Sequence, residues 1–241
     1  MIFLKKTGQL WTYGLLLCAL GFSSNAVAQS EIDYVDAVFD VSYNSTSSSS
    51  DAHLTINNNG GNFRANFVIE HTLLDTAQSA QFSNNQCSIT PQSYTSTAKA
   101  AFRSKTTESL SFNWPAKTAT RHHNKDGNVS FTLDQQLYDP MSLFFKARCD
   151  LIAGKTQLSY PLIHKGKEKT HRYNVIGTEV VKTGMGKYEA LVVQRQRSNP
   201  DRRTTFYVAP ALDYLIVKIH HRENSLANVS MTLKSMDYKT K

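Results

Sequence analysis

Apolar and polar residues alternate with a period of two along most of this chain after its first 30 residues. Phe39, Val41 and Tyr43, for example, are separated by Asp40 and Ser42. Successive side chains of a β-strand point to opposite faces, so this pattern predicts strands with one apolar and one polar face. Further alternating segments occupy residues 52–56, 63–69, 110–114, 129–133, 158–162, 173–175, 188–194, 215–219 and 229–233.

Short polar segments separate several of these strands. Residues 57–61, three Asn and two Gly, predict a hairpin turn because both residue types tolerate positive φ. Residues 165–167 and 183–187 predict two further turns, and the serine-rich residues 45–51 predict a polar loop. Strands joined at short intervals by tight turns favour a mainly antiparallel all-β fold, built as one strongly curved sheet or a barrel-like meander.

One short helix is predicted near residues 139–150. Asp139 is a residue type that caps helices, Pro140 suits the first helical position, and the residues from 141 to 150 contain no helix breaker. We expect this helix to pack on the sheet.

The first 28 residues have the features of an export signal. Lys5 and Lys6 precede an apolar stretch from residue 10 to 22, and residues 26–28 form a small-x-small cleavage pattern. The stretch is shorter than the roughly 20 residues that a membrane span needs. Cys18 follows three leucines, which does not fit the small residue that lipidation requires. We therefore predict cleavage after Ala28 and a periplasmic protein with no transmembrane segment, in which residues 29–241 form a single β domain.

Two of the three cysteines remain after cleavage, Cys87 and Cys149. In an oxidising compartment this count favours one structural disulfide between them. The C-x-x-C spacing of a thiol-exchange site is absent from the sequence.

The segment Leu137, Tyr138, Asp139, Pro140, Met141, Ser142, Leu143, Phe144, Phe145, with Arg148 after it, resembles the central signature of the bacterial exported domain-of-unknown-function family 3108. Residues 90–94 and 112–114 upstream, and residues 175–178, 184–188 and 203–215 downstream, follow in that family's order. The chain departs from the pattern at Leu215, where proline is expected, and at its two cysteines. The resemblance implies an uncharacterised periplasmic protein of β architecture and supplies no catalytic residues.

Charge is unevenly distributed along the chain. Residues 29–150 contain nine basic and twelve acidic residues, a formal charge of −3, whereas residues 151–241 contain sixteen and seven, a charge of +9. Two hairpins of the second half carry clustered basic residues that are candidate contacts for an anionic ligand; a solvated basic surface is the alternative. These candidates are Lys165, Lys167, Lys169, Arg172, Arg195, Arg197, Arg202 and Arg203.

Several aromatic residues occupy the apolar positions of predicted strands. The simplest interpretation is that they fill the core; the alternative is that they line an apolar cavity enclosed by a curved sheet. The candidate lining residues are Phe39, Phe63, Phe67, Phe112, Trp114 and Phe131.

No catalytic or metal-binding motif stands out. His122 and His123 are adjacent, as are His220 and His221, and neighbouring residues of a strand point to opposite faces rather than toward one metal ion. The Gly184–Gly186 segment lies between strands and lacks the rest of a phosphate-binding loop. We predict no cofactor, no metal and no enzymatic activity.

These observations favour a non-enzymatic binding protein of the cell envelope. The predicted ligand is a lipid, lipopolysaccharide, an acidic polysaccharide or another amphipathic anion, held by the curved sheet with the basic hairpins near its charged group. The alternatives are a structural or assembly factor that contacts another envelope protein through sheet edges, and, less favoured, a hydrolase of envelope polymers. Export argues against a nucleic-acid partner.

Overall fold

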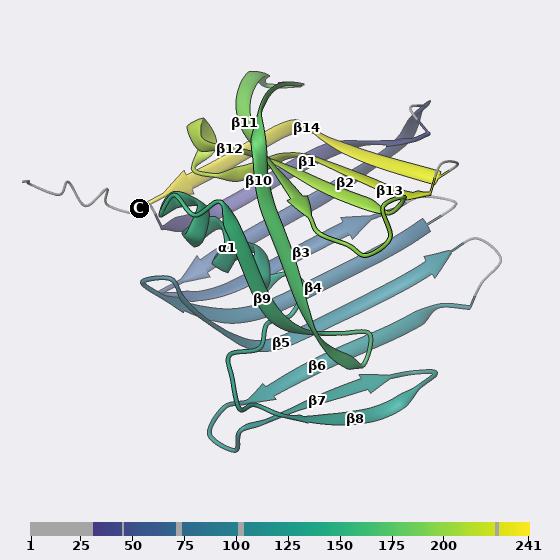
Figure 1. Cartoon of the computed structure of the whole chain (residues 1–241), viewed down its shortest axis with the longest axis vertical. Helices are drawn as coiled ribbons and strands as arrows, with labels where there is room; N and C mark the ends of the chain where they lie inside the picture. The colour runs from purple at the N-terminus through teal and green to yellow at the C-terminus, as the bar shows by residue number, and fades with distance from the viewer. Residues whose placement is uncertain (1–30, 45, 71–73, 101–103, 225–226) are drawn as a thin grey trace, which may run out of the picture.

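The computed structural model describes residues 31–44, 46–70, 74–100, 104–224 and 227–241 (Figure 1). The predicted signal peptide, with Cys18, lies outside the described residues. The first eight strands are β1 (Ile32–Tyr43), β2 (Thr46–Asn59), β3 (Asn62–Ile69), β4 (Leu74–Asn85), β5 (Ser88–Ala100), β6 (Thr106–Asn113), β7 (Thr118–His123) and β8 (Gly127–Thr132). The remaining elements are α1 (Ser142–Ile152), β9 (Gln157–His164), β10 (Lys167–Thr183), β11 (Gly186–Arg195), β12 (Arg203–Ala209), the 3₁₀ turn η1 (Pro210–Leu212), β13 (Leu215–Asn224) and β14 (Ala227–Thr240).

All the strands belong to one antiparallel sheet of 14 strands, in the order β8-β7-β6-β5-β4-β3-β2-β1-β14-β13-β12-β11-β10-β9. The chain builds the sheet outward from β1 to β8, crosses to the opposite edge through α1, and returns from β9 to β14, which pairs with β1. The sheet is not closed, because β8 and β9 remain separate edges. The prediction of a mainly antiparallel all-β fold is confirmed.

Bulges bend the sheet around its apolar face. The register shifts between Val38 and Phe39, between Gln81 and Phe82, and between Tyr207 and Val208, and such bulges increase the local bend and twist of a strand. We call the concave side the inner face. It carries the buried apolar residues predicted by the alternation, including Phe39.

The β9–β10 hairpin crosses the inner face of the sheet (Figure 1). Its turn contains Lys165 at φ 53° and Gly166 at φ 68°, as expected for a two-residue hairpin turn. A Cβ at Gly166 would lie 3.1 Å from Nη1 of Arg121. The tip of this hairpin therefore contacts a side chain of β7, although β7 and the hairpin lie near opposite ends of the strand order.

Helix α1 packs against the inner face near β4 and β5 and against β9. Its Phe145 ring lies with its centroid 4.4 Å from that of Phe82 and 5.5 Å from that of Phe63. The expected disulfide is present: Cys149 of the helix is bonded to Cys87 in the β4–β5 turn, with the two Cα atoms 5.9 Å apart. Aromatic packing and a covalent bond thus hold one face of the helix on the sheet.

Two local predictions need correction. The polar loop expected at residues 45–51 is wrong beyond residue 45, because β2 begins at Thr46 and pairs with β1. Backbone pairing with the neighbouring strand overrides the low strand propensity of a serine-rich segment. The helix predicted near residues 139–150 is confirmed, from Ser142 to Ile152; only Pro140, expected at the first helical position, lies before it. Among the described residues no helix is long and apolar enough to cross a membrane.

Candidate functional site

An apolar cavity of about 350 Å³ lies between the start of α1 and the inner face of the sheet. Strands from both halves of the chain form its wall, since Phe39 and Phe67 come from β1 and β3 whereas Ile219 and Met231 come from β13 and β14. Gln78 is the single polar side chain in the lining. Its Oε1 accepts a hydrogen bond from the Tyr94 hydroxyl at 3.3 Å, which leaves the wall predominantly apolar.

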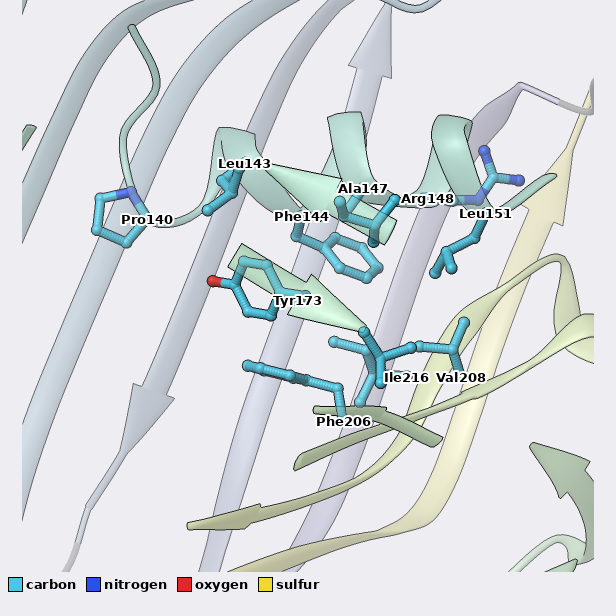
Figure 2. A pocket seen from close by; sticks show the side chains of 12 residues that line it. Pro140, Leu143, Phe144, Ala147, Arg148, Leu151, Tyr173, Phe206, Val208 and Ile216 are labelled. Carbon is cyan, nitrogen blue, oxygen red and sulfur yellow. The ribbon is translucent and has the colours of Figure 1, made fainter. Parts of the chain in front are cut away.

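A second compartment of about 90 Å³ adjoins the first along the helix. The two share Pro140, Phe144, Phe206 and Ile216. Figure 2 shows Phe144 and Leu143 extending from the helix toward Tyr173, Phe206 and Ile216 on the sheet side. The helix is therefore the roof of both compartments.

Buried polar residues fix the start of this roof. Asp139 is fully buried, and its Oδ1 accepts hydrogen bonds from the backbone N–H of Met141 at 2.8 Å and of Ser142 at 3.0 Å. The Ser142 hydroxyl donates to Oδ2 at 2.6 Å. Burial raises the pKa of Asp139, although these hydrogen bonds oppose the shift. The carboxyl group satisfies backbone donors that the first helical turn leaves unpaired.

The end of the helix is anchored by two more polar residues. Arg148 donates from Nε to the backbone carbonyl of Asp213 at 2.7 Å, and in Figure 2 its guanidinium points away from the compartment. Asp150 accepts hydrogen bonds from Lys155 at 2.7 Å and from the Tyr160 hydroxyl at 2.8 Å. Burial alone would raise the pKa of Asp150, but the hydrogen bonds lower it overall. Every charge near the roof has a partner.

A second polar region lies at one end of the apolar wall and consists of Arg195, Arg197 and Arg202, which we call the arginine cluster. Arg195 pairs with Tyr173 across β10 and β11, and Val193, two residues earlier, lines the smaller compartment. Residues two apart on a strand lie on the same face, roughly 7 Å from each other. Arg195 therefore continues the apolar wall toward its polar end.

Hydrogen bonds join the arginine cluster to neighbouring strands. Arg197 donates from Nη2 to Thr204 Oγ1 at 3.1 Å, and Thr204 Oγ1 lies 2.9 Å from Nδ1 of His221. His221 Nε2 lies 3.1 Å from Glu223 Oε2, which also lies 2.7 Å from Arg202 Nε. Glu223 thereby compensates Arg202.

Arg195 and Arg197 have no such compensation. Within the part of the chain that the structure describes, no carboxylate lies within 4 Å of either guanidinium. The Nε atom of each is buried without a hydrogen-bond partner. Burial lowers the pKa of both groups, and the charge of Arg197 lowers that of Arg195 further. Glu223 acts on Arg197 from a distance and partly opposes this shift, but no described carboxylate contacts either guanidinium. Two positive charges thus lie side by side and half-buried.

His171 and His164, which lie beside Arg195, are neutral at pH 7. Arg195 Nη2 donates to Nε2 of His171, whose Nδ1 faces the Tyr173 hydroxyl at 3.4 Å. Burial, and then the charge of Arg195, lowers the pKa of His171 to about 3. Burial, and then Lys165, lowers the pKa of His164 to about 4. The positive charge of the region therefore belongs to its arginines.

The eight candidate anion contacts fall into two groups. Arg195, Arg197 and Arg202 are half-buried and come together at the end of the wall. The other five are exposed and lie around the same two hairpins; these are Lys165, Lys167, Lys169, Arg172 and Arg203. Arg195 of the β11–β12 hairpin donates to His171 of the β9–β10 hairpin, so the structure brings the two basic hairpins of the sequence near one another.

The six candidate lining residues lie in three different places. Phe39 and Phe67 line the larger cavity. Phe63 is buried in the core, stacked on Phe82 with ring centroids 5.2 Å apart. The remaining three pack partly buried against the core at the β6–β8 end of the sheet, with Phe112 stacked on Trp114; they are Phe112, Trp114 and Phe131.

The histidine pairs lie where the alternation puts them. His122 and His123 end β7, with His122 exposed and His123 half-buried, and His220 and His221 occupy opposite faces of β13. No group of three or more His, Cys, Asp or Glu side chains able to hold a metal ion occurs in the described residues. Gly184 and Met185 form the β10–β11 turn, and Gly186 begins β11.

Four residues of this region were not predicted from the sequence: His171, Tyr173, Thr204 and Phe206. One signal was present, because Thr204 and Phe206 are two residues apart on one strand and so share a face, as do His171 and Tyr173 on another. Their convergence depends on which strands are neighbours, and alternation within a strand carries no information about that.

Comparisons with known proteins complete the description. The sequence profile described as "Protein of unknown function (DUF3108)" matches residues 38–234. A crystal structure titled as a beta-barrel-like protein of domain of unknown function DUF1849 from Brucella abortus is similar, with a TM-score of 0.60 and 11% sequence identity. The match covers 87% of this chain and 99% of that one, and at this identity it concerns the fold alone. No curated protein matches the chain.

Proposed function

Because this chain belongs to the DUF3108 family, whose function is unknown, we propose from its site that it is a non-enzymatic binding protein of the cell envelope. Its ligand is an amphipathic anion such as a lipid, with the apolar part in the cavity beneath α1. The single observation that carries the proposal is the apolar cavity of about 350 Å³. Pockets for small ligands start at roughly 300 Å³ and are mostly apolar.

The polar groups around the cavity support binding rather than catalysis. Asp150 lies in α1, and Asp139 lies three residues before the helix begins. The carboxylate oxygens of both accept hydrogen bonds that hold α1 in place. A general base needs a free acceptor aimed at the substrate. These carboxyl groups instead stabilise the helix that covers the cavity.

Export to the periplasm is part of the proposal. The predicted signal peptide motivates it, and the disulfide between Cys87 and Cys149 is compatible with an oxidising compartment. A lipid ligand suits this location, because the envelope supplies lipids and a protein that moves between membranes has to shield their acyl chains from water.

A cavity-filling variant tests the proposal. We expect Met231→Trp to reduce the affinity for a short-chain diacylglycerol at least about tenfold, since Met231 lines the cavity and the larger ring occupies its volume. The control is Thr232→Trp, which adds the same ring on the opposite face of β14, where Thr232 pairs with Lys218 and Asp40. Titration calorimetry measures both. If the unsubstituted protein binds no diacylglycerol, and native mass spectrometry of gently purified protein detects no apolar ligand, the proposal fails.

One observation favours the assembly-factor alternative. β10 pairs with β9 only over residues 167–174, and beyond this segment Ile176 and Val180 are 56% and 63% exposed. An unpaired strand edge with apolar side chains is suited to strand addition by a partner protein. A photo-crosslinker at position 180 in intact cells distinguishes the two: a single protein adduct favours this alternative, whereas lipid adducts favour the carrier.

A further inference from the structure

We propose that Arg195 and Arg197 bind the phosphate group of the ligand, so that the protein recognises a phosphorylated lipid rather than an apolar molecule in general. This inference rests on the proposed function, because it places the head of the same ligand whose tail lies in the cavity. The observation behind the inference is that two arginines without a contacting carboxylate among the described residues lie next to the apolar wall.

The first step is the position of the pair relative to the cavity. Val193 lines the smaller compartment, and Arg195 follows it two residues later on the same face of β11. On β12, Phe206 lines both compartments, and Thr204, two residues before it, accepts the hydrogen bond from Arg197. Each strand thus changes from apolar wall to arginine site within one step of roughly 7 Å. A ligand with its tail against Phe206 places its head beside the arginines.

The second step is charge. Arg195 and Arg197 are half-buried next to each other, and among the described residues no carboxylate lies within 4 Å of either one. The nearby Glu223, which contacts Arg202, acts on Arg197 from a distance, so three arginines share one carboxylate. Bringing two like charges together in a partly desolvated place costs free energy that folding alone does not recover. Arg202, the third member, already has Glu223 at 2.7 Å. The site therefore lacks about two negative charges.

The third step is the chemistry that fits this deficit. A phosphate monoester carries about −1.5 to −2 charges at pH 7 and three acceptor oxygens, whereas a carboxylate carries one charge and two oxygens. Guanidinium groups bind phosphate through paired N–H donors. The Nε atoms of Arg195 and Arg197 are buried. Their Nη2 atoms donate to His171 and Thr204, so the N–H groups of Nη1 on each side chain are the donors that face the phosphate. His171 accepts from Arg195, which orients that guanidinium without removing its charge.

The fourth step is access. Arg195 and Arg197 keep part of their surface in solvent, and Gln196 and Ser198 beside them are exposed. A charged head at this position remains near water, while the tail enters the apolar compartments under α1. This arrangement matches the two ends of an amphipathic molecule with the two environments of the site.

The experiment compares ligands that differ by one phosphate. Titration calorimetry of the full mature chain uses short-chain phosphatidic acid, diacylglycerol with the same acyl chains, and inorganic phosphate. We expect phosphatidic acid to bind at least about tenfold more tightly than diacylglycerol, since a hydrogen bond to a charged group contributes that factor or more. Arg195→Gln and Arg197→Gln should each remove at least about tenfold of the phosphatidic acid affinity and leave diacylglycerol binding unchanged.

The matched control is Arg172→Gln. Arg172 lies on β10 between His171 and Tyr173, points to the opposite face and is exposed, so this variant removes the same charge away from the site. If it weakens phosphatidic acid binding as much as Arg195→Gln does, general electrostatic attraction explains the affinity and the inference is overturned.

Further outcomes separate this inference from the proposed function. Equal binding of phosphatidic acid and diacylglycerol overturns the phosphate site and leaves the carrier function standing. Inorganic phosphate bound as tightly as phosphatidic acid, with the same losses in the two variants, overturns the lipid assignment in favour of a free phosphate site. The carrier function itself is refuted if diacylglycerol does not bind and Met231→Trp leaves the affinity for phosphatidic acid unchanged.

Discussion

Two buried arginine sites on the inner face of the sheet differ in how their charge is balanced. On β7, Arg121 is 3% exposed and its Nη2 lies 2.9 Å from Glu108 and 3.3 Å from Asp126. On β11 and the segment after it, Arg195 and Arg197 are half-buried, and no carboxylate of the described residues lies within 4 Å of either guanidinium. A balanced charge serves the fold, and an unbalanced one is available to a ligand.

The β7 site also supports the shape of the molecule. A Cβ at Gly166 would lie 3.1 Å from Nη1 of Arg121 and 3.4 Å from its Cζ, so the guanidinium forms the surface on which the tip of the β9–β10 hairpin rests. Burial alone would lower the pKa of Arg121, but the hydrogen bonds that it donates to Glu108 and Asp126 raise it overall. This arginine therefore connects β6, β7 and the hairpin that crosses the inner face.

The largest effect is expected from Arg121→Gln. Removing one partner of a buried ion pair leaves Glu108, whose side chain is 18% exposed, without its cation, and such losses cost about 3–5 kcal/mol of the free energy of unfolding. Urea unfolding followed by circular dichroism measures the change. The control is the exposed Arg64 on β3, where Arg64→Gln should change the free energy by less than about 0.5 kcal/mol. A loss below about 1 kcal/mol for Arg121→Gln would show that the pair does not hold the hairpin.

Sequence alone predicts much of this architecture and little of the site. Alternation predicted that Phe39 and Phe67 belong to apolar strand faces, and the residues at 57–61 and 165–167 predicted turns that the structure contains. Each of these features depends on neighbours along the chain. The cysteine count, together with the predicted export, was sufficient to predict the disulfide between Cys87 and Cys149.

The arginine cluster depends on contacts that local patterns do not specify. Arg195 meets His171 only because β10 and β11 pair in one register, and Phe39 shares a cavity with Met231 only because β14 returns to β1. A one-residue slip of register would move Arg195 to the other face of the sheet. The eight basic candidates were therefore found by composition, and only the strand order distinguishes the inner three from the exposed five.

The second effect, of intermediate size, concerns pH. The pKa of His171 is lowered to about 3 in the folded protein from an ordinary value of 6.5. Between these values the unfolded chain binds a proton that the folded chain does not, so the free energy of unfolding falls as the pH falls through about 6.5. For one buried histidine the slope reaches at most about 1.4 kcal/mol per pH unit.

Thermal unfolding between about pH 7.5 and pH 5 measures this slope. We expect His171→Gln to reduce the slope while the contribution of His164, whose pKa is also lowered, to about 4, remains. His122→Gln, which changes an exposed histidine, is the control. An unchanged slope in the His171 variant would mean that His171 takes up its proton in the folded state as readily as in the unfolded chain. The positive charge of the cluster would then vary with pH instead of residing in its arginines.

The smallest effect on stability is expected from the residues that matter most for the ligand. Without ligand, Arg195→Gln and Arg197→Gln each remove one of two neighbouring positive charges that have no described carboxylate in contact, and glutamine retains an N–H donor for His171 or Thr204. The free energy of unfolding should therefore stay within about 0.5 kcal/mol of its original value or rise, as is common where a binding site is kept at some cost to stability. Urea unfolding beside Arg121→Gln gives the direct contrast. A loss of more than about 1 kcal/mol in both variants would make these arginines structural, and the difference between the two sites of the inner face would disappear.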